Sequence, residues 1–368
     1  MREEGQISAY QAMGYQVSIV LATAILFVPA ITAQYARQDA WLSLVLAYLF
    51  GSLQVFVATK LALKFPRETV IQYAPRVAGK ILGKVIGFIY IFYFFYVAYF
   101  VQREFEALMS AAYLPQTPII VVIIMLTLLA AYVLYGGLEV LCRVNAIILA
   151  VALFGLLLIF LLIVKDIEFT RFLPFLENGV GPVVLGAVVP GGWFGETAVI
   201  LMLLPFIGNQ GKTLKTSLLA VTILFVVMEM VVIGAVGIMG PNETGRFLYP
   251  TFNIARRVTI EALPILERQD AMFMMIWVAG MLMKLSTFFY AGTLGLAQWL
   301  NLRSYRILIL PAGAVMTALG MQAWENIVEL KSFSGEVFPL TIIFVNFMLT
   351  GFLYLLTFLK PKSLQGAS

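Results

Sequence analysis

The chain has 368 residues and a formal net charge of +5, with 62% hydrophobic residues and only 12% charged ones. A soluble domain of this size needs more charge to cover its surface, so the composition excludes a soluble globular protein and indicates a chain embedded in lipid. One cysteine, Cys142, and no histidine exclude an intrachain disulfide, a Cys/His zinc site and histidine-based acid–base catalysis. No contiguous basic run with interleaved aromatic residues occurs outside the apolar segments, so we expect no nucleic-acid partner.

Ten apolar segments follow one another along the chain. A spanning helix needs about 20 mostly apolar residues, and only a helix satisfies its own backbone hydrogen bonds in hydrocarbon, so each segment predicts a transmembrane helix. The period-2 alternation of a membrane barrel is absent. The fold class is therefore all-α and polytopic, with predicted spans at residues 10–33, 40–60, 83–109, 117–136, 138–165, 183–207, 213–239, 271–300, 305–323 and 337–359.

Basic residues are shared unequally between the two sides that these spans define. With the N-terminus inside, one side carries 14 of the 24 Lys and Arg residues with four acidic residues, and the other carries nine basic and 13 acidic residues. The positive-inside rule then places both termini in the cytoplasm. Two connections are long, residues 61–82 and 241–270. Each predicts a helix lying at the membrane surface, the second at Thr251–Leu263, with a gate or a docking site for a partner protein as the alternative.

The ten spans divide into two sets of five with opposite orientation, which is the arrangement of an inverted-repeat transporter. We expect one transmembrane domain over residues 1–368, with the first repeat at about 10–165 and the second at about 183–359. The similar stretches Leu26–Pro29 and Met202–Pro205 lie at equivalent depths in the first and sixth spans.

The sixth span contains the run from Val189 to Glu196, which includes Pro190 and three glycines. Proline removes a hydrogen-bond donor, and each glycine costs about 1 kcal/mol in a helix interior, so we predict a discontinuous helix here. Irregular backbone at this depth needs partners from protein or from a water-filled cavity. The break therefore predicts a cavity that receives the amides of a second half-helix, where a carboxylate ligand is favoured. A simple proline kink, or a helix that begins at Trp193, is the alternative.

The first span is expected to be discontinuous as well, near Leu21–Ile25. The signal there is a run of small residues, Ala22, Thr23 and Ala24, which permits close approach of another backbone.

Three ionisable residues, Glu196, Glu229 and Lys284, fall well inside predicted spans. An unpaired charge at mid-membrane costs at least about 2.5–3.5 kcal/mol, so such residues usually face the bundle interior and carry function. Glu196 is either a capping carboxylate or the partner of a substrate amine or proton. Lys284 is either a fixed ammonium in place of a sodium ion or one half of a salt bridge with Glu196 or Glu229. No metal-ligand cluster or nucleophile–base pair appears, so we expect no metal, no cofactor and no enzyme activity.

Aromatic residues dominate the third span. Interfacial belts explain tyrosines near span ends, but Tyr96 lies close to the centre, where its hydroxyl needs a partner. Tyr96 and Tyr99 are the two tyrosines that we expect to line a cavity. Arg103, Glu104 and Glu106 at the end of this span are interpreted as a solvated ion-pair cluster.

Several short motifs spread over nearly the whole chain resemble those of the B subunits of spore nutrient germinant receptors, a GerAB-like family. These are Phe65-Pro66-Arg67-Glu68-Thr69-Val70-Ile71-Gln72-Tyr73 with Gly79–Lys84, Phe172-Leu173-Pro174 with Glu177-Asn178-Gly179, Phe194-Gly195-Glu196 with Leu204-Pro205, Tyr305–Pro311, and the closing Lys360-Pro361. The resemblance implies a LeuT-type fold in the amino acid–polyamine–organocation superfamily. It also implies recognition of a nutrient such as an amino acid in the spore inner membrane, and assembly with an A subunit and a C-subunit lipoprotein to trigger germination.

Carried over by position, the resemblance implies a pocket formed by Thr23 and Ala24, Tyr96, Phe194 to Glu196, and Thr287 with Tyr290. Family members tend to have glycine where this chain has Ala22 and Ala24, and Pro-Phe-Gly-Glu where it has Trp193–Glu196. The alanine side chains at positions 22 and 24 would limit contact between a ligand and the backbone of the first span. A proton- or cation-coupled amino-acid permease is the alternative function, since receptor and permease would share fold and pocket.

Overall fold

The computed structural model describes residues 5–257 and 269–359. Its regular structure within these ranges is helical, apart from a parallel bridge between Ile7 and Ile207. The α-helices are α1 (Ala9–Ala36), α2 (Ala40–Leu63), α3 (Val70–Ala78), α4 (Lys80–Ala112), α5 (Ile119–Tyr135), α6 (Gly137–Ile163), α7 (Val180–Gly195), α8 (Ile200–Leu203), α9 (Thr213–Met239), α10 (Pro241–Arg246), α11 (Pro250–Arg257), α12 (Gln269–Trp299), α13 (Arg306–Gln322), α14 (Ile327–Ile343) and α15 (Thr350–Leu359).

Each of the ten predicted spans corresponds to a helix or a pair of consecutive helices. Seven helical stretches of the described chain are long and apolar enough to cross a bilayer, and the first of them, Ala9–Leu63, contains both α1 and α2. Two shorter apolar helices, α5 and α13, complete the ten. The prediction of about ten transmembrane helices is confirmed, and the protein is a multi-pass membrane protein.

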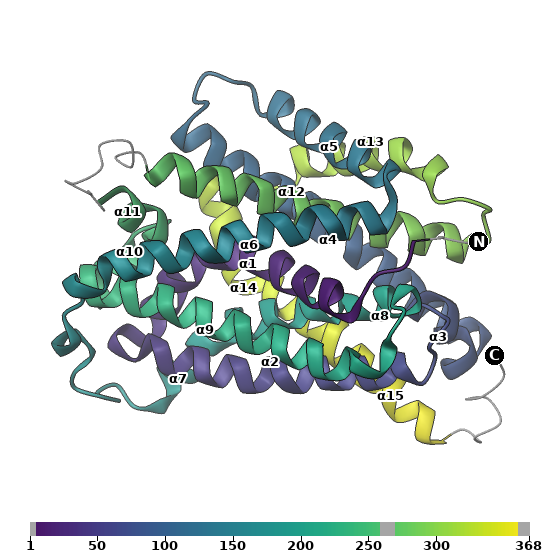
Figure 1. The fold of residues 1–368 in the computed structure, drawn as a ribbon, viewed down its shortest axis with the longest axis horizontal. Coiled ribbons are helices and arrows are strands. Elements are labelled where there is room, and N and C mark those ends of the chain that lie inside the picture. The colour runs from purple at the N-terminus through teal and green to yellow at the C-terminus, as the bar shows by residue number, and fades with distance from the viewer. Residues whose placement is uncertain (1–4, 258–268, 360–368) are drawn as a thin grey trace.

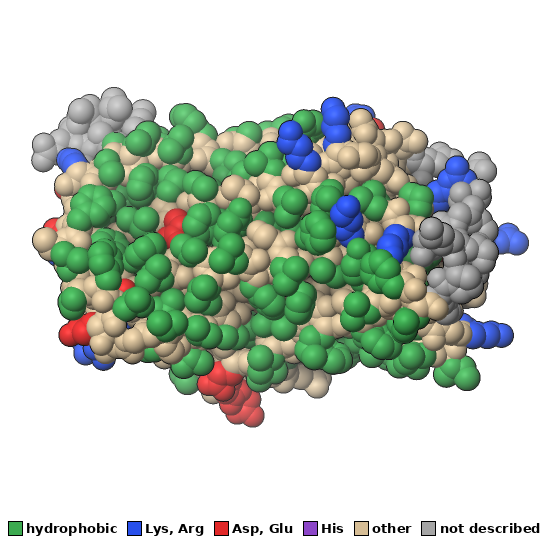
Figure 2. All heavy atoms as spheres, turned by 90° about the horizontal axis from the view of Figure 1, so that it is seen from below, with side chains coloured by type: hydrophobic (Ala, Val, Ile, Leu, Met, Phe, Trp, Pro, Cys, Tyr) green, Lys and Arg blue, Asp and Glu red, His purple; other side chains and the backbone are tan. Residues whose placement is uncertain are grey.

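The long helices run side by side along the longest axis of the molecule (Figure 1). The short helices α10 and α11 lie at one end of the bundle, called here the α10–α11 end, and α3 lies at the other, called the α3 end. Figure 2 shows a surface on which hydrophobic side chains cover the middle, while Lys and Arg side chains gather toward the α3 end. A wide apolar belt between polar ends matches a molecule whose middle faces hydrocarbon.

Helix α1 occupies the centre of the bundle and packs against α6, α7, α9 and α12. It is one continuous α-helix through Leu21–Ile25, so the predicted interruption of the first span is wrong. Alanine is the best helix former, and small residues by themselves do not break a helix. Pro29 within α1 has no N–H for the carbonyl of Ile25, and the Thr251 hydroxyl of α11 donates to that oxygen at 2.6 Å instead.

The sixth span is interrupted as predicted, but the interruption follows Gly195 and does not lie at Pro190. The α-helix α7 includes Pro190 and the following glycines and ends at Gly195, after which Glu196–Val199 form a 3₁₀ turn that leads into α8. The glycines serve close packing, because a Cβ at Gly192 would lie 3.0 Å from the Pro339 backbone of α14. The three glycines in this run therefore allow close contact between helices and do not interrupt α7.

The last span begins earlier than predicted and changes its helical form midway. Helix α14 starts at Ile327, and a π-helical segment, Phe344–Leu349, joins α14 to α15. Such π segments occur mostly as single turns and frequently at functional sites.

Helices α3, α10 and α11 fall in the two long connections. Helix α3 begins with a capping box formed by Thr69 and Gln72 and buries Val70, Tyr73 and Val77, which confirms a helix in residues 61–82. Helix α11 covers the first part of the predicted Thr251–Leu263 helix, and residues 258–263 of that prediction lie outside the described residues.

Candidate functional site

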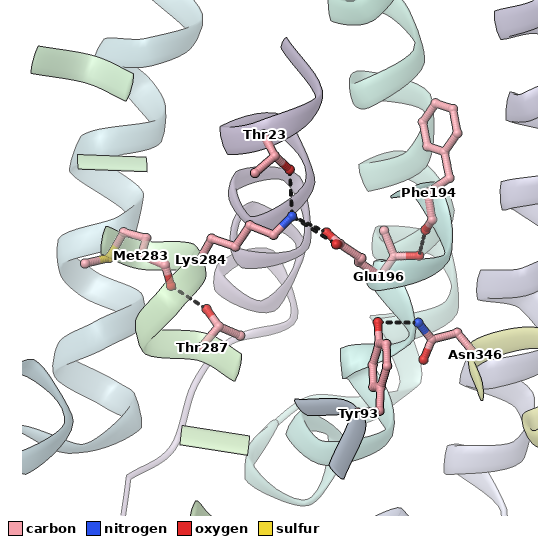
Figure 3. A network of polar contacts seen from close by, with 9 residues as sticks. Thr23, Tyr93, Phe194, Glu196, Met283, Lys284, Thr287 and Asn346 are labelled. Carbon is pink, nitrogen blue, oxygen red and sulfur yellow. Dashed lines mark hydrogen bonds and ion pairs between the residues drawn. The ribbon is translucent and has the colours of Figure 1, made fainter. Parts of the chain in front are cut away.

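Three side chains from three elements meet in the middle of the bundle: Thr23 of α1, Glu196 of the 3₁₀ turn and Lys284 of α12 (Figure 3). The Lys284 ammonium lies 2.8 and 2.9 Å from the two carboxylate oxygens of Glu196 and donates to the Thr23 hydroxyl at 2.7 Å. All three residues are at most 1% exposed. The sequence singled out each of them, and the structure selects Glu196 over Glu229 as the partner of Lys284.

Local chain geometry places Glu196 at this position. The α-helical pattern stops at Gly195, and two glutamine side chains donate to backbone carbonyls near the change. Gln16 of α1 donates to the Thr197 carbonyl at 2.8 Å, and Gln54 of α2 donates to the Gly191 carbonyl at 2.9 Å. These contacts fix the 3₁₀ turn against α1 and α2, which orients the Glu196 carboxylate toward α12.

The space beside Gly195 is filled by protein, so the predicted cavity does not lie there. A Cβ at Gly195 would come within 2.2 Å of the Gln54 Oε1 atom and 3.2 Å of Ile342. A cavity of about 40 Å³ lies instead between α1, α6 and α12, lined in part by Ser18, Ala22 and Gly280. Ala22 precedes Thr23 on α1 and Gly280 lies one turn before Lys284 on α12, but neither Thr23 nor Lys284 lines this cavity.

The ion pair needs no further charged or polar partner for the Lys284 ammonium. An ammonium has three N–H donors, and Thr23 with the two Glu196 oxygens accepts all three. Removing two charges from water is costly, and the cost is offset only when geometry is good and the remaining donors are satisfied. The pair therefore holds α1, α12 and the 3₁₀ turn together in a neutral, buried cluster.

The other residues of the expected pocket surround this cluster but point elsewhere. Ala24 is fully buried in α1, and the Thr287 hydroxyl donates to the Met283 carbonyl of its own helix at 2.7 Å. The Phe194 side chain packs against α2, where a Cβ at Gly51 would meet its Cβ atom at 2.4 Å. The Tyr290 ring makes an edge contact with Tyr305 at 5.3 Å between centroids.

Tyr96 and Tyr99 belong to a separate part of the molecule. They line an apolar groove of about 360 Å³ between α4, α12 and α13, together with side chains such as Phe92 and Leu308. The Tyr96 ring also stacks on Phe338 of α14, with 5.7 Å between centroids. These two tyrosines are not brought together with the Glu196–Lys284 pair.

A further polar contact lies near the cluster, between Tyr93 and Asn346. Neither residue was predicted as a site residue from the sequence. The Asn346 amide of the π-helical segment donates to the Tyr93 hydroxyl at 2.7 Å (Figure 3). Tyr93 lies one helical turn before Tyr96, on the same tyrosine row of α4. This spacing could have indicated Tyr93 as a site residue, whereas no sequence pattern indicated Asn346.

The acidic residues at the end of α4 are buried, so their interpretation as a solvated cluster is wrong. Arg103 donates to Glu106 at 2.9 Å and to the Trp324 carbonyl at 3.0 Å, and Glu104 is 1% exposed. Neither Glu104 carboxylate oxygen has a hydrogen-bond partner among the described residues. Packing of α4 against α12 and the chain after α13 encloses a segment whose charge alone suggested exposure.

Glu229 of α9 also has two buried carboxylate oxygens without a hydrogen-bond partner among the described residues. It lies apart from the contacts that Lys284 makes. The described part of the chain contains no group of three or more His, Cys, Asp or Glu residues that could hold a metal ion.

Known proteins resemble this chain at the level of sequence and of fold. A family model described as spore germination protein matches residues 6–327. Spore germination protein KB of Bacillus subtilis (strain 168) is 26% identical over 345 residues, which cover 92% of this chain and 91% of that protein. Spore germination protein YndE of the same organism is 25% identical over 297 residues, covering 80% of this chain and 81% of that protein.

Two solved structures share the fold at low sequence identity. MhsT in complex with L-phenylalanine has a TM-score of 0.68 at 12% identity and covers 100% of this chain and 97% of its own. Mhp1, a nucleobase-cation-symport-1 family transporter in a closed conformation with bromovinylhydantoin bound, has a TM-score of 0.71 at 10% identity, covering 95% and 78%. The resemblance to spore germination proteins and the LeuT-type transporter fold are thus both confirmed. With a family model that matches residues 6–327 and relatives that cover most of its length, the chain belongs to the spore germination protein family.

Proposed function

We propose that the chain is the nutrient-recognition subunit of a spore germinant receptor, and that it binds a small zwitterion, an amino acid, where Lys284 and Glu196 now pair. The observation that carries this proposal is the buried Thr23–Glu196–Lys284 cluster, which joins α1, the 3₁₀ turn and α12 halfway along the bundle. A polytopic membrane protein of a spore germination family with a transporter fold supplies the setting.

A zwitterion suits this cluster because it brings one charge of each sign. Its carboxylate replaces Glu196 as partner of Lys284, and its ammonium replaces Lys284 as partner of Glu196. Each buried charge then keeps a counter-charge, so separating the pair does not leave an uncompensated ion. A ligand with one charge leaves Lys284 or Glu196 unpaired and is rejected. The cavity of about 40 Å³ between α1, α6 and α12 holds only a water-sized group, so binding requires α1 and α12 to move apart.

Such a movement gives the subunit a way to signal. Lys284 links α12 to Thr23 of α1, while Gln16 of the same helix holds the Thr197 carbonyl of the 3₁₀ turn. A ligand that changes the first contact therefore displaces α1 relative to the sixth span. We propose that an A subunit and a C-subunit lipoprotein read this displacement in the spore inner membrane.

The proposed orientation places both termini and the α3 end in the cytoplasm. The gathering of Lys and Arg side chains toward the α3 end supports it (Figure 2), because cytoplasmic segments carry an excess of basic residues.

A proton- or cation-coupled amino-acid permease is the second candidate, and the fold shared with Mhp1, a cation-symport family transporter, favours it. Radiolabelled amino-acid uptake into proteoliposomes containing the purified chain separates the two. Binding without concentrative uptake is expected for the receptor, whereas concentrative uptake driven by an ion gradient contradicts it.

Thermal stabilisation of the purified protein across a panel of L-amino acids tests the site, since a ligand that binds only the folded state raises apparent stability. The double variant Lys284→Met/Glu196→Gln keeps the cluster neutral and is expected to fold but to lose the stabilisation. The control double variant Lys80→Met/Glu243→Gln removes the same two charges from the surface and should respond like the wild type. An unchanged response in the first variant would remove the site assignment.

A further inference from the structure

The apolar groove of about 360 Å³ between α4, α12 and α13 is not used by the proposed ligand site. Its wall on α4 extends from Phe88 to Tyr99, and its wall on α13 extends from Leu308 to Leu319. Each stretch advances about 16 Å along its helix, because an α-helix rises about 1.5 Å per residue. A Cβ at Gly320, next to Leu319, would lie 3.6 Å from the Tyr99 carbonyl oxygen. Tyr99 and Leu319 therefore mark one end of the groove, and Phe88 and Leu308 mark the other.

The residues that line this groove are all hydrophobic or aromatic, and none of them is charged. Phe92 and Val315, which belong to its two main walls, are 57% and 61% exposed, so the groove opens on the surface of the bundle. In a bilayer this surface faces hydrocarbon. A length of about 16 Å is about half of the hydrocarbon core, which is about 30 Å thick, so the groove spans one leaflet. Its lining and length suit one extended acyl chain and do not suit a zwitterion.

Two basic residues and a tryptophan lie at the Phe88 end of the groove. Lys84 lies one turn before Phe88 on α4, and Arg306 is the first residue of α13, two residues before Leu308. Both are exposed, and neither forms an ion pair with a carboxylate of the described residues. The Trp299 indole N–H of α12 donates to the Lys84 carbonyl at 3.0 Å, and the Trp299 ring lies 5.9 Å from that of Phe88. Tryptophan is enriched at the level of lipid head groups, so the two cations lie where a phosphate would meet them.

We propose that this groove binds one anionic phospholipid from the leaflet at the α3 end, with an acyl chain between α4 and α13 and the phosphate at Lys84 and Arg306. The Phe88 end of the groove belongs to the α3 end, because Gly83, next to Lys84, packs against α3. Lys and Arg side chains gather toward that end (Figure 2). The apolar walls bind an acyl chain of any lipid, and the two cations add the preference for a negative head group. The site is independent of the proposed amino-acid site, so either can fail without the other.

Native mass spectrometry of the delipidated chain tests the head-group preference, with phosphatidylglycerol and phosphatidylcholine that carry the same acyl chains. The wild type should bind one phosphatidylglycerol more tightly than phosphatidylcholine. Lys84→Gln/Arg306→Gln should lower the phosphatidylglycerol affinity about fivefold for each charge removed and leave phosphatidylcholine unaffected. Lys212→Gln/Lys215→Gln, which removes two exposed charges at the start of α9, is the matched control and should behave like the wild type. Equal affinities of the wild type for the two lipids, or an unchanged preference in the first variant, would overturn the proposal.

Blocking variants test the position of the acyl chain. Ala312→Phe places a ring in the groove and should weaken the binding of both lipids, whereas Ala314→Phe, on an exposed part of α13 that does not line the groove, is the matched control. If Ala312→Phe fails to fold, as judged by size exclusion and circular dichroism, Val315→Trp on the exposed wall replaces it. Glycerol 1-phosphate, a head group without a chain, should not displace phosphatidylglycerol. Undiminished lipid binding in the folded blocking variant, or displacement by glycerol 1-phosphate, contradicts a chain in the groove.

Discussion

The side-chain amide of Gln16 donates to the Thr197 carbonyl at 2.8 Å, and Thr197 directly follows Glu196 in the chain. Thr23 lies two turns along α1 from Gln16 and accepts a hydrogen bond from Lys284, the partner of Glu196. Helix α1 is therefore attached to the interrupted sixth span at two positions. Gln16 binds its backbone directly, and Thr23 binds Lys284, which pairs with Glu196 of that span. The continuity of α1 matters here, because a rigid helix couples the two attachments.

The first prediction concerns the energetic coupling of Lys284 and Glu196. Lys284→Met leaves the Glu196 carboxylate buried without its counter-charge and should destabilise the protein by about 3–5 kcal/mol. Adding Glu196→Gln removes that charge and should restore much of the loss. Thermal unfolding of the single and double variants in detergent, followed by tryptophan fluorescence, measures the coupling. Additive effects of the two substitutions would show that the pair is not a unit.

The second prediction concerns the close approach of α2 and α7. Gly195→Ala places a methyl group 2.2 Å from Gln54 Oε1 and should cost about 1–3 kcal/mol, because the Gln54 side chain must leave the Gly191 carbonyl. Gly335→Ala in α14 is the matched control, since a Cβ there meets open space and alanine favours a helix. Thermal unfolding compares them, and equal melting temperatures would contradict tight packing at Gly195.

The third prediction concerns the carbonyl that Pro29 leaves without a helical partner. Thr251→Val removes its hydrogen bond and should destabilise the protein by about 1–3 kcal/mol, the cost of a buried unsatisfied carbonyl. In a Pro29→Ala background the Ile25 carbonyl regains an N–H donor, so the same Thr251→Val substitution should cost less. A double-mutant cycle from thermal unfolding measures the difference. If Thr251→Val costs the same in both backgrounds, the hydroxyl does not replace the missing donor.

The fourth prediction concerns the orientation in the membrane. Cys142 is fully buried, so a membrane-impermeant thiol reagent should not label the wild-type chain in intact vesicles. Lys80→Cys at the α3 end should be labelled only from the cytoplasmic side, and Glu243→Cys on α10 only from the opposite side, each in a Cys142→Ala background. The reverse pattern would invert the proposed topology.

Composition and hydropathy determined the number and order of the spans, because hydrocarbon forces every crossing segment to be an apolar helix whatever its neighbours are. The same constraint singled out Glu196 and Lys284, since an ion inside a span requires a partner. Only tertiary packing decided the rest. The Thr251 hydroxyl and the Gln16 and Gln54 amides satisfy freed carbonyls from distant parts of the chain, so α1 stays continuous and the sixth span changes to a 3₁₀ turn without a cavity at Gly195. Burial of Glu104 likewise depends on neighbours that contact α4 only in the folded bundle, which is why a charged stretch that suggested solvent exposure proved to be interior.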